Sequence, residues 1–240
     1  MSHDSKRHSL NRLRLGAVVL ALASLGACGG GGDATPAAPN PLTVDASTGL
    51  STMNSTALDA ALATVPMQAL SPTEAASLVF MREEEKLAGD VYLRMDALWG
   101  ASMPIFRNIA GSEATHTEAV RTLLVRYNLP DPAANLGPGV YQNATLQSLY
   151  AQLVAAGSAS LVAGLQVGAT IEELDIVDLS NQLKDVDNPD IVLVYQNLMK
   201  GSRNHLRSFY RTLQQLGATY VPQYLSPADF AAIVNSPIER

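Results

Sequence analysis

The residues with the clearest capacity for chemistry are an acid and an imidazole, Glu113 and His116, in the segment GSEATHTEAV. A separation of three residues places both side chains on one face of a helix, where they can reach the same metal ion. Carboxylate and imidazole ligands suit iron or manganese. The pair therefore predicts a metal site, provided that this face of the helix points into the protein.

The sequence around this pair has the start and stop signals of a helical protein. The segment SPTE sets Ser71 as N-cap, Pro72 at the first helical position and Glu74 as the acid of a capping box. We expect long helices at about 71–98, 104–127, 158–186 and 188–216, and short ones at 57–64, 145–155 and 226–234. Gly164 and Gly168 predict a kink in the third long helix.

No segment alternates apolar and polar residues over a convincing strand length, so the predicted fold class is all-α. Four long helices joined by loops are what a four-helix bundle needs. The segment between the second and third long helices is long enough to be a crossover connection. We therefore predict a bundle with a crossover and short extra helices.

Each of the four apolar stripes is interrupted near its middle by residues that can bind a metal. The interrupting residues are Glu85 in the first helix, Glu113 and His116 in the second, Glu172 in the third and His205 in the fourth. Burying unpaired carboxylates is costly, and a cation held among them would compensate their charge. The alternative is a pair of core histidines that neighbouring carboxylates satisfy.

At these residues the sequence resembles the ferritin-like di-iron carboxylate proteins, in which two helices give one Glu each and two give Glu-x-x-His. The segments EEEKLAGDVYL, FRNIAGSEATH, VGATIEELDIVDL and NLMKGSRNHLRSF resemble more closely an uncharacterised bacterial and archaeal ferritin-like family, domain of unknown function 2202, over about 72–216. The resemblance implies a ferritin-like bundle. It also implies these metal ligands: Glu85, Glu113, His116, Glu172 and His205.

Ser202 stands where a complete second Glu-x-x-His motif would hold its Glu. Because a hydroxyl is a poor substitute for a bridging carboxylate, three arrangements stay open: a lopsided dinuclear site, a single metal ion, or a dinuclear site completed by another acid such as Asp175. The expected cofactor is iron, in a di-iron or mononuclear site, with manganese as the alternative.

Three further acids and a tyrosine lie beside the expected ligands. A shifted helix phase would let Glu84 or Glu173 replace their neighbours, but we expect both, and Glu83, to be solvated surface charges. Tyr92 lies on the first apolar stripe and is expected in the core. A tyrosine beside iron can also carry redox chemistry.

The N-terminal segment resembles a bacterial export signal. Four basic residues precede an apolar stretch, 15–25, that is too short to span a bilayer comfortably. The stretch ends in LGAC, which resembles the lipobox of bacterial lipoproteins, so we expect cleavage after residue 27 and a lipid on Cys28. The alternative is an ordinary secretory cleavage, and either route takes the chain out of the cytoplasm.

These signals divide the chain into four expected parts. They are a lipoprotein signal peptide at 1–27, a flexible tether with a short helix at 28–70, the ferritin-like bundle at 71–217 and a C-terminal tail with a short helix at 218–240. Gly, Pro and Ala dominate 29–49, as in flexible linkers. We expect an exported lipoprotein, anchored to a membrane and facing the periplasm.

Charge and cysteine content limit the function. The net charge is −6, and loss of residues 1–27 makes it more negative, which argues against nucleic acid as a partner. With one cysteine there is no rubredoxin-like centre, so another protein or Fe(II) itself must donate electrons. Iron held by carboxylates and imidazoles can reduce dioxygen or peroxide, so we expect an iron-dependent oxidase or peroxidase, or a ferroxidase. The alternative is a non-catalytic metal-binding or structural helical module of the envelope, and the sequence does not indicate an oligomeric state.

Overall fold

The computed structural model describes residues 40–240, and most helices in this range begin at a side chain that accepts a backbone N–H of the first turn. At the first long helix the Ser71 hydroxyl accepts the Glu74 N–H at 3.2 Å, and the Glu74 carboxylate accepts the Ser71 N–H at 2.9 Å. The elements in chain order are β1 (Leu42–Val44), β2 (Ser51–Met53), α1 (Ser55–Thr64), α2 (Pro72–Trp99), α3 (Ile105–Arg126), α4 (Ala144–Gly157), α5 (Leu161–Gln182), α6 (Pro189–Gln215) and α7 (Pro227–Val234).

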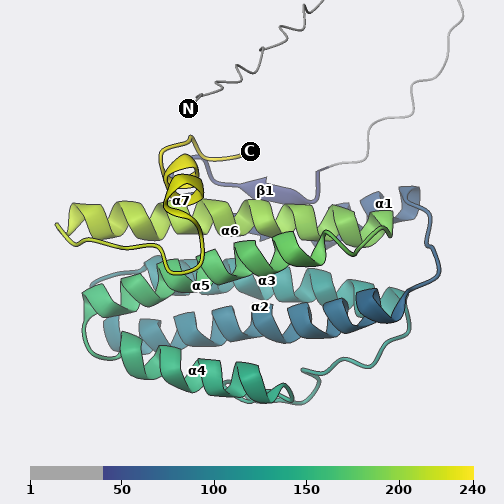
Figure 1. The fold of residues 1–240 in the computed structure, drawn as a ribbon, viewed down its shortest axis with the longest axis horizontal. Helices are drawn as coiled ribbons and strands as arrows, with labels where there is room; N and C mark the ends of the chain where they lie inside the picture. The colour runs from purple at the N-terminus through teal and green to yellow at the C-terminus, as the bar shows by residue number, and fades with distance from the viewer. Residues whose placement is uncertain (1–39) are drawn as a thin grey trace, which may run out of the picture. The chain divides into compact units, whose positions relative to one another are not determined.

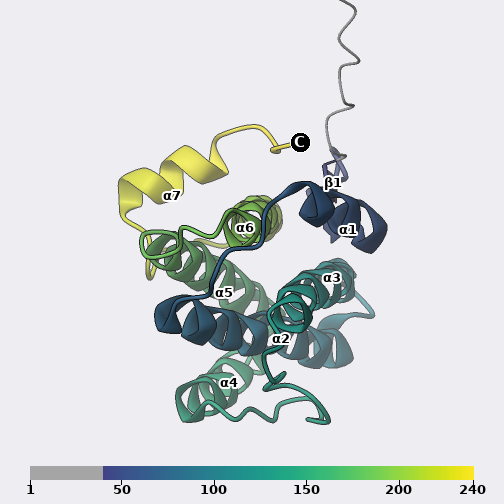
Figure 2. The ribbon, with the colours of Figure 1, turned by 90° about the vertical axis from the view of Figure 1, so that its right-hand side faces the viewer.

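Helices α2, α3, α5 and α6 form a four-helix bundle (Figures 1 and 2). Short loops join α2 to α3 and α5 to α6, whereas a long connection that carries α4 leads from α3 to α5. Helix α4 packs on the outer side of α2 and α5 (Figure 2). The prediction of an all-α bundle with a crossover and short extra helices is confirmed.

Helix α5 is continuous where two glycines predicted a kink. A Cβ atom on Gly168 would lie 2.5 Å from the ring of Phe209, and one on Gly164 would lie 3.2 Å from Trp99. Both glycines therefore let large aromatic side chains of neighbouring helices approach the α5 backbone. Their role is in packing, and the helix continues through both of them.

The apolar core consists of two clusters of buried hydrophobic residues, one toward each end of the bundle. One cluster contains Tyr92 and Phe209, and the other contains Met81 and Leu123. Buried acids and imidazoles from all four bundle helices occupy the level between them. The bundle therefore encloses a polar layer between two apolar ones.

The segment before the bundle differs from the expected flexible tether. Strands β1 and β2 form an antiparallel hairpin, with Leu42 opposite Met53, that packs on α3 and α6 (Figure 1). Its turn ends at Gly49, whose φ of +78° is readily accessible to glycine. Strands this short carry too little alternation to be found from sequence. The expected short helix is present as α1, while the predicted signal peptide and Cys28 lie outside the described residues.

The C-terminal segment also packs against the bundle. Helix α7 contacts α6. Beyond it, Glu239 Oε1 accepts hydrogen bonds at 2.7 Å from Arg203 Nε and from Arg207 Nη2 of α6. Within residues 40–240, none of the helices has the length and apolar character needed to cross a membrane.

Candidate metal centre

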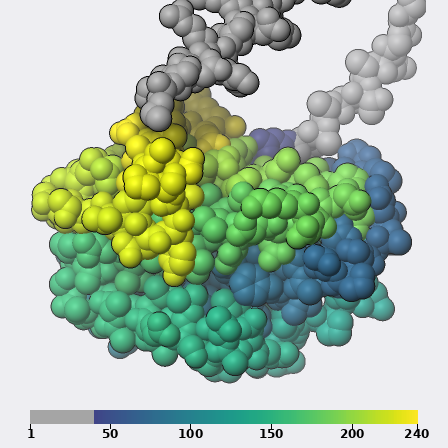
Figure 3. Space-filling view, in the orientation of Figure 1, coloured from purple at the N-terminus to yellow at the C-terminus, as the bar shows by residue number. Residues whose placement is uncertain are grey.

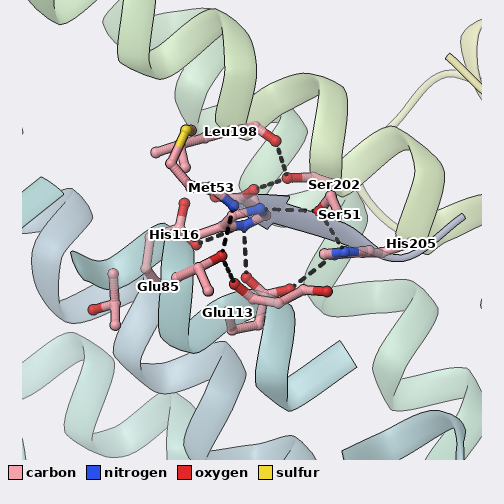
Figure 4. Close-up of polar contacts among 12 residues, drawn as sticks. Ser51, Met53, Glu85, Glu113, His116, Leu198, Ser202 and His205 are labelled. Carbon is pink, nitrogen blue, oxygen red and sulfur yellow. Dashed lines mark hydrogen bonds and ion pairs between the residues drawn. The ribbon is translucent and has the colours of Figure 1, made fainter. Parts of the chain in front are cut away.

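The polar layer brings the five predicted ligands together in two groups that share one residue. Ligand-type atoms of Glu85, Glu113 and His116 lie within 4.8 Å of one another, and so do those of Glu113, Glu172 and His205. All five side chains are at most 3% exposed. Figure 4 shows Glu113 beneath the two imidazole rings, with Glu85 on the side of His116.

The two groups are almost symmetric about Glu113. His116 Nδ1 lies 3.0 Å from Glu113 Oε2 and 3.6 Å from Glu85 Oε2. His205 Nδ1 lies 2.9 Å from Glu113 Oε1 and 3.5 Å from Glu172 Oε2. Each imidazole therefore directs its Nδ1 atom toward two carboxylates. One is the carboxylate that belongs only to its own group, and the other is that of Glu113, which both groups share.

The opposite edges of both rings meet a serine that the sequence did not indicate. The rings stack with centroids 5.4 Å apart, and Ser51 Oγ lies 3.0 Å from Nε2 of His116 and 2.9 Å from Nε2 of His205. Gly201 makes room for this contact, because a Cβ there would lie 2.6 Å from His116 Cε1. Ser51 belongs to the segment expected to be a tether, so no sequence signal connected it with the histidines.

Several buried atoms of the centre have no hydrogen-bond partner among residues 40–240. They are Glu85 Oε1, Glu113 Oε1 and His205 Nδ1. The last two lie 2.9 Å apart, but their alignment is not that of a hydrogen bond. Buried polar atoms normally find partners, so their shared orientation fits a cation. Three carboxylates and two imidazoles are a donor set that suits iron or manganese.

Burial and neighbouring charges shift the pKa values of the groups in the centre in opposite directions. Burial raises the pKa of Glu85 and of Glu172 to about 7. Burial also opposes ionisation of Glu113, but the His116 and His205 imidazolium groups hold its pKa well below the usual range. Although burial lowers the pKa of His205, the carboxylates of Glu172 and Glu113 raise it to about 9. Protons thus supply the compensating positive charge, and a bound cation would replace them.

Tyr92 contacts the centre directly. Its hydroxyl donates to Glu172 Oε1 at 2.6 Å and lies 3.3 Å from the carbonyl oxygen of Gly168. Burial is the main cause that raises the pKa of Tyr92 well above its usual value, and the negative charge of Glu172 is the second. The tyrosine is thus a neutral donor that fixes the orientation of one expected ligand.

Ser202 and Asp175 bond to each other and belong to neither group of ligand atoms. The Ser202 hydroxyl donates a short hydrogen bond to Asp175 Oδ2, and it also lies 3.0 Å from the Leu198 carbonyl oxygen. Asp175 Oδ1 is buried and has no partner in the described chain. Ser202, which stands where a second Glu-x-x-His motif would have its Glu, therefore positions the carboxylate of Asp175 on α5.

Three acids expected at the surface are buried instead: Glu83, Glu84 and Glu173 are at most 4% exposed. Glu83 accepts the backbone N–H groups of 142–143 at 2.5 and 3.0 Å, at the start of α4. Glu173 Oε2 accepts those of 223–225 at 2.8 to 2.9 Å. The expectation was wrong because segments outside the bundle cover these helix faces. Glu84 accepts no hydrogen bond from the described chain.

A small cavity of about 140 Å³ reaches the centre between α2 and α3. Glu85 and Glu113 line it together with the small residues Gly89, Ala110 and Ala114. A space of this size holds only a few molecules as large as water. It can admit a diatomic gas or a peroxide, whereas a metabolite of ordinary size does not fit.

Comparisons with known proteins place the chain in one family. A family model described as "Uncharacterized protein domain (DUF2202)" matches residues 74–237. Uncharacterized protein MJ0754 of Methanocaldococcus jannaschii is 49% identical over 179 residues, which cover 75% of this chain and 96% of the relative. The structure titled "Crystal structure of hypothetical protein MJ0754 from Methanococcus jannaschii DSM 2661" superposes with a TM-score of 0.71 at 50% identity, covering 73% of this chain and 99% of that one. On this similarity of sequence and structure, the chain belongs to the DUF2202 domain family.

Proposed function

We propose that this protein is a ferritin-like metalloprotein that binds two iron ions and acts as an oxidase, peroxidase or ferroxidase. The observation that carries the proposal is the pair of buried ligand groups that share Glu113. Iron held there would supply electrons to dioxygen or peroxide. Manganese is the alternative metal, because the same hard oxygen and imidazole ligands suit it.

The residues divide the work of binding between two positions. Glu85 and His116 would hold one ion, Glu172 and His205 the other, and Glu113 would contact both. An imidazole that binds a metal through Nδ1 carries its proton on Nε2. The two lone pairs of the Ser51 hydroxyl oxygen can accept both of these protons in hydrogen bonds, which would fix the two ring orientations.

The chain also limits which reactants reach the ions. The cavity beside Glu85 and Glu113 suits a small oxidant, and the apolar clusters on either side exclude bulk water from the centre. Electrons must come from Fe(II) as substrate or from a donor protein. We place this activity in the cell envelope, on a lipoprotein that a lipid on Cys28 anchors to the membrane with its bundle facing the periplasm.

A second function is a metal-binding or structural helical module without turnover. The specific observation that favours it is Ser202, since the fourth helix lacks the carboxylate that a symmetric di-iron enzyme would have there. Both functions require folded bundles, but only the first requires oxidation of bound Fe(II).

Anaerobic titration of the metal-free protein with Fe(II), followed by metal analysis, tests the proposal. We expect two ions per chain in the wild type, none tightly bound in Glu113→Ala, and two in the control Glu118→Ala, whose side chain pairs with Arg121 on the surface. Addition of oxygen or peroxide should then oxidise the bound iron and consume the oxidant. Two bound ions without oxidation would favour the metal-binding module. No bound iron would contradict the oxidase, peroxidase or ferroxidase and would favour the structural module.

A further inference from the structure

The glutamate next to the expected ligand Glu85 is buried without a partner. Glu84 is 4% exposed, and neither of its carboxylate oxygens has a hydrogen-bond donor among residues 40–240. Its neighbour Glu83, equally buried, receives two backbone N–H groups. An ionised carboxylate in such surroundings destabilises a fold unless a proton or a cation neutralises it. The fold therefore gives Glu84 no stabilising role of its own.

Glu84 lines a cleft that α2, α4 and α5 form at the surface. The cleft has a volume of about 570 Å³, and Asp178, Ser148, Gln152 and Tyr224 line it as well. Asp178 is half-buried and Glu84 lies deeper, so the acids become less exposed from the mouth inward. On the face shown in Figure 3, α4 (teal) lies below the cleft and α5 (green) above it. No lysine or arginine is among the described residues that line the cleft.

Asp175 lies between this cleft and the metal centre. It follows Glu172 by three residues on α5 and precedes Asp178 by three, so the three acids share one helix face. Asp175 and Asp178 are the negative charges that act most strongly on Glu84, and the charge of Glu85 acts on Asp175. Acidic side chains therefore continue from the surface cleft to the edge of the ligand groups.

We propose that Glu84 and Asp178 form a transit site for a divalent cation, from which the ion passes by way of Asp175 to the metal centre. That the ion ends at the metal centre rests on the proposed function. Oxygen ligands in a cleft whose described lining has no basic residue suit a hydrated divalent metal such as Fe²⁺ or Mn²⁺. The unpartnered oxygens of Glu84 and Asp175 supply successive ligands along this path. The small cavity between α2 and α3 then remains available to the oxidant.

Stopped-flow absorption of Co²⁺ on binding to the metal-free full-length protein tests this route. We expect Glu84→Gln to slow loading of the centre about tenfold, because a cleft of one charge sign raises association rates by at least that factor. Final occupancy should be unchanged. Ser148→Trp, which fills the cleft without a change in charge, should slow loading too. Asp185→Asn removes an exposed charge elsewhere on the chain and should load at the wild-type rate.

Wild-type loading rates in both Glu84→Gln and Ser148→Trp would overturn the transit route. The proposed function fails separately, if wild-type protein takes up no Co²⁺ at the centre at all. In that event, the anomalous signal of crystals soaked in Mn²⁺ shows whether the cleft binds a cation independently of the centre. A peak beside Glu84 and Asp178 that disappears in Glu84→Gln would support a cation site there, and its absence in the wild type would refute one.

Discussion

Three consecutive glutamates of α2 have three different surroundings. Successive residues of a helix are rotated by about 100°, so neighbours in sequence face different parts of the molecule. Glu83 meets the start of α4, Glu84 meets the surface cleft, and Glu85 meets His116 in the centre. All three acids are therefore buried, including the two that were expected at the surface, and each side chain has a different neighbour.

Ser51 provides the sharpest test of how the histidines are held. Replacement by Ala removes the hydroxyl that lies within 3.0 Å of both Nε2 atoms. Outer-sphere hydrogen bonds to ligating histidines are worth about 10- to 100-fold in metal affinity, so we expect Ser51→Ala to weaken binding of both ions by at least tenfold. Isothermal titration with Mn²⁺ would measure the change.

A suitable control is Ser77→Ala, which removes another buried hydroxyl, one that bonds to Tyr195 at 2.8 Å. It should leave metal affinity as in the wild type. Equal affinities in the wild type and Ser51→Ala would show that the bundle alone fixes the rings, and that the hairpin has no part in metal binding.

At the scale of the elements, the segments outside the four bundle helices complete the molecule. The hairpin covers the histidines, α4 borders the cleft, and the loop before α7 bonds to α5. The four bundle helices, and the Ser71 capping box of the first, could be predicted from sequence because capping and apolar periodicity are local. Ser51 and the burial of Glu83 and Glu173 could not, because they depend on where distant covering segments come to lie.

The same division describes the candidate centre. Five ligand-type residues were found because each interrupts a regular stripe, and the structure brings all five together. The partners that orient them carry no such pattern. Asp175 was named only as a substitute ligand, whereas in the structure its carboxylate is held by Ser202 beside the centre. Periodicity identifies which side chains face inward, but contacts between helices decide which of them meet.

Glu83 and Glu173 allow the anchoring of two covering segments to be tested separately. Glu173→Ala removes the carboxylate that accepts the three backbone N–H groups of 223–225. Glu83→Ala removes the carboxylate that accepts the two backbone N–H groups of 142–143. We expect each to cost about 1–3 kcal/mol of local stability. Hydrogen exchange should accelerate only in the segment that each acid holds. Faster exchange in both segments from one variant would indicate global destabilisation instead.

For the whole molecule, the buried centre couples stability to pH. The folded-state pKa values of Glu85 and Glu172, about 7, exceed the usual 4.5, and that of His205, about 9, exceeds 6.5. The metal-free folded chain thus holds more protons than the unfolded chain between these values, so its free energy of unfolding should fall as the pH rises from 4.5 to about 9. Glu113 shifts in the opposite direction, and its contribution is lost only in acid.

Thermal unfolding at about pH 5 and about pH 9, with and without Mn²⁺, checks this coupling. The metal-free melting temperature should be lower at the higher pH, while the increase on adding Mn²⁺ should be larger there, because the ion competes with protons for the same atoms. A metal-free protein that becomes more stable toward pH 9 would contradict the assigned directions.

The polar layer between two apolar clusters has a consequence for motion. Each end of the bundle is closed by its own cluster, so the helices can separate slightly at the middle while both ends stay packed. Such breathing at mid-height would let solvent and cargo exchange with the interior at a small fraction of the free energy of complete unfolding. The exchange of metal ions that the proposed function involves would then need no loss of tertiary structure.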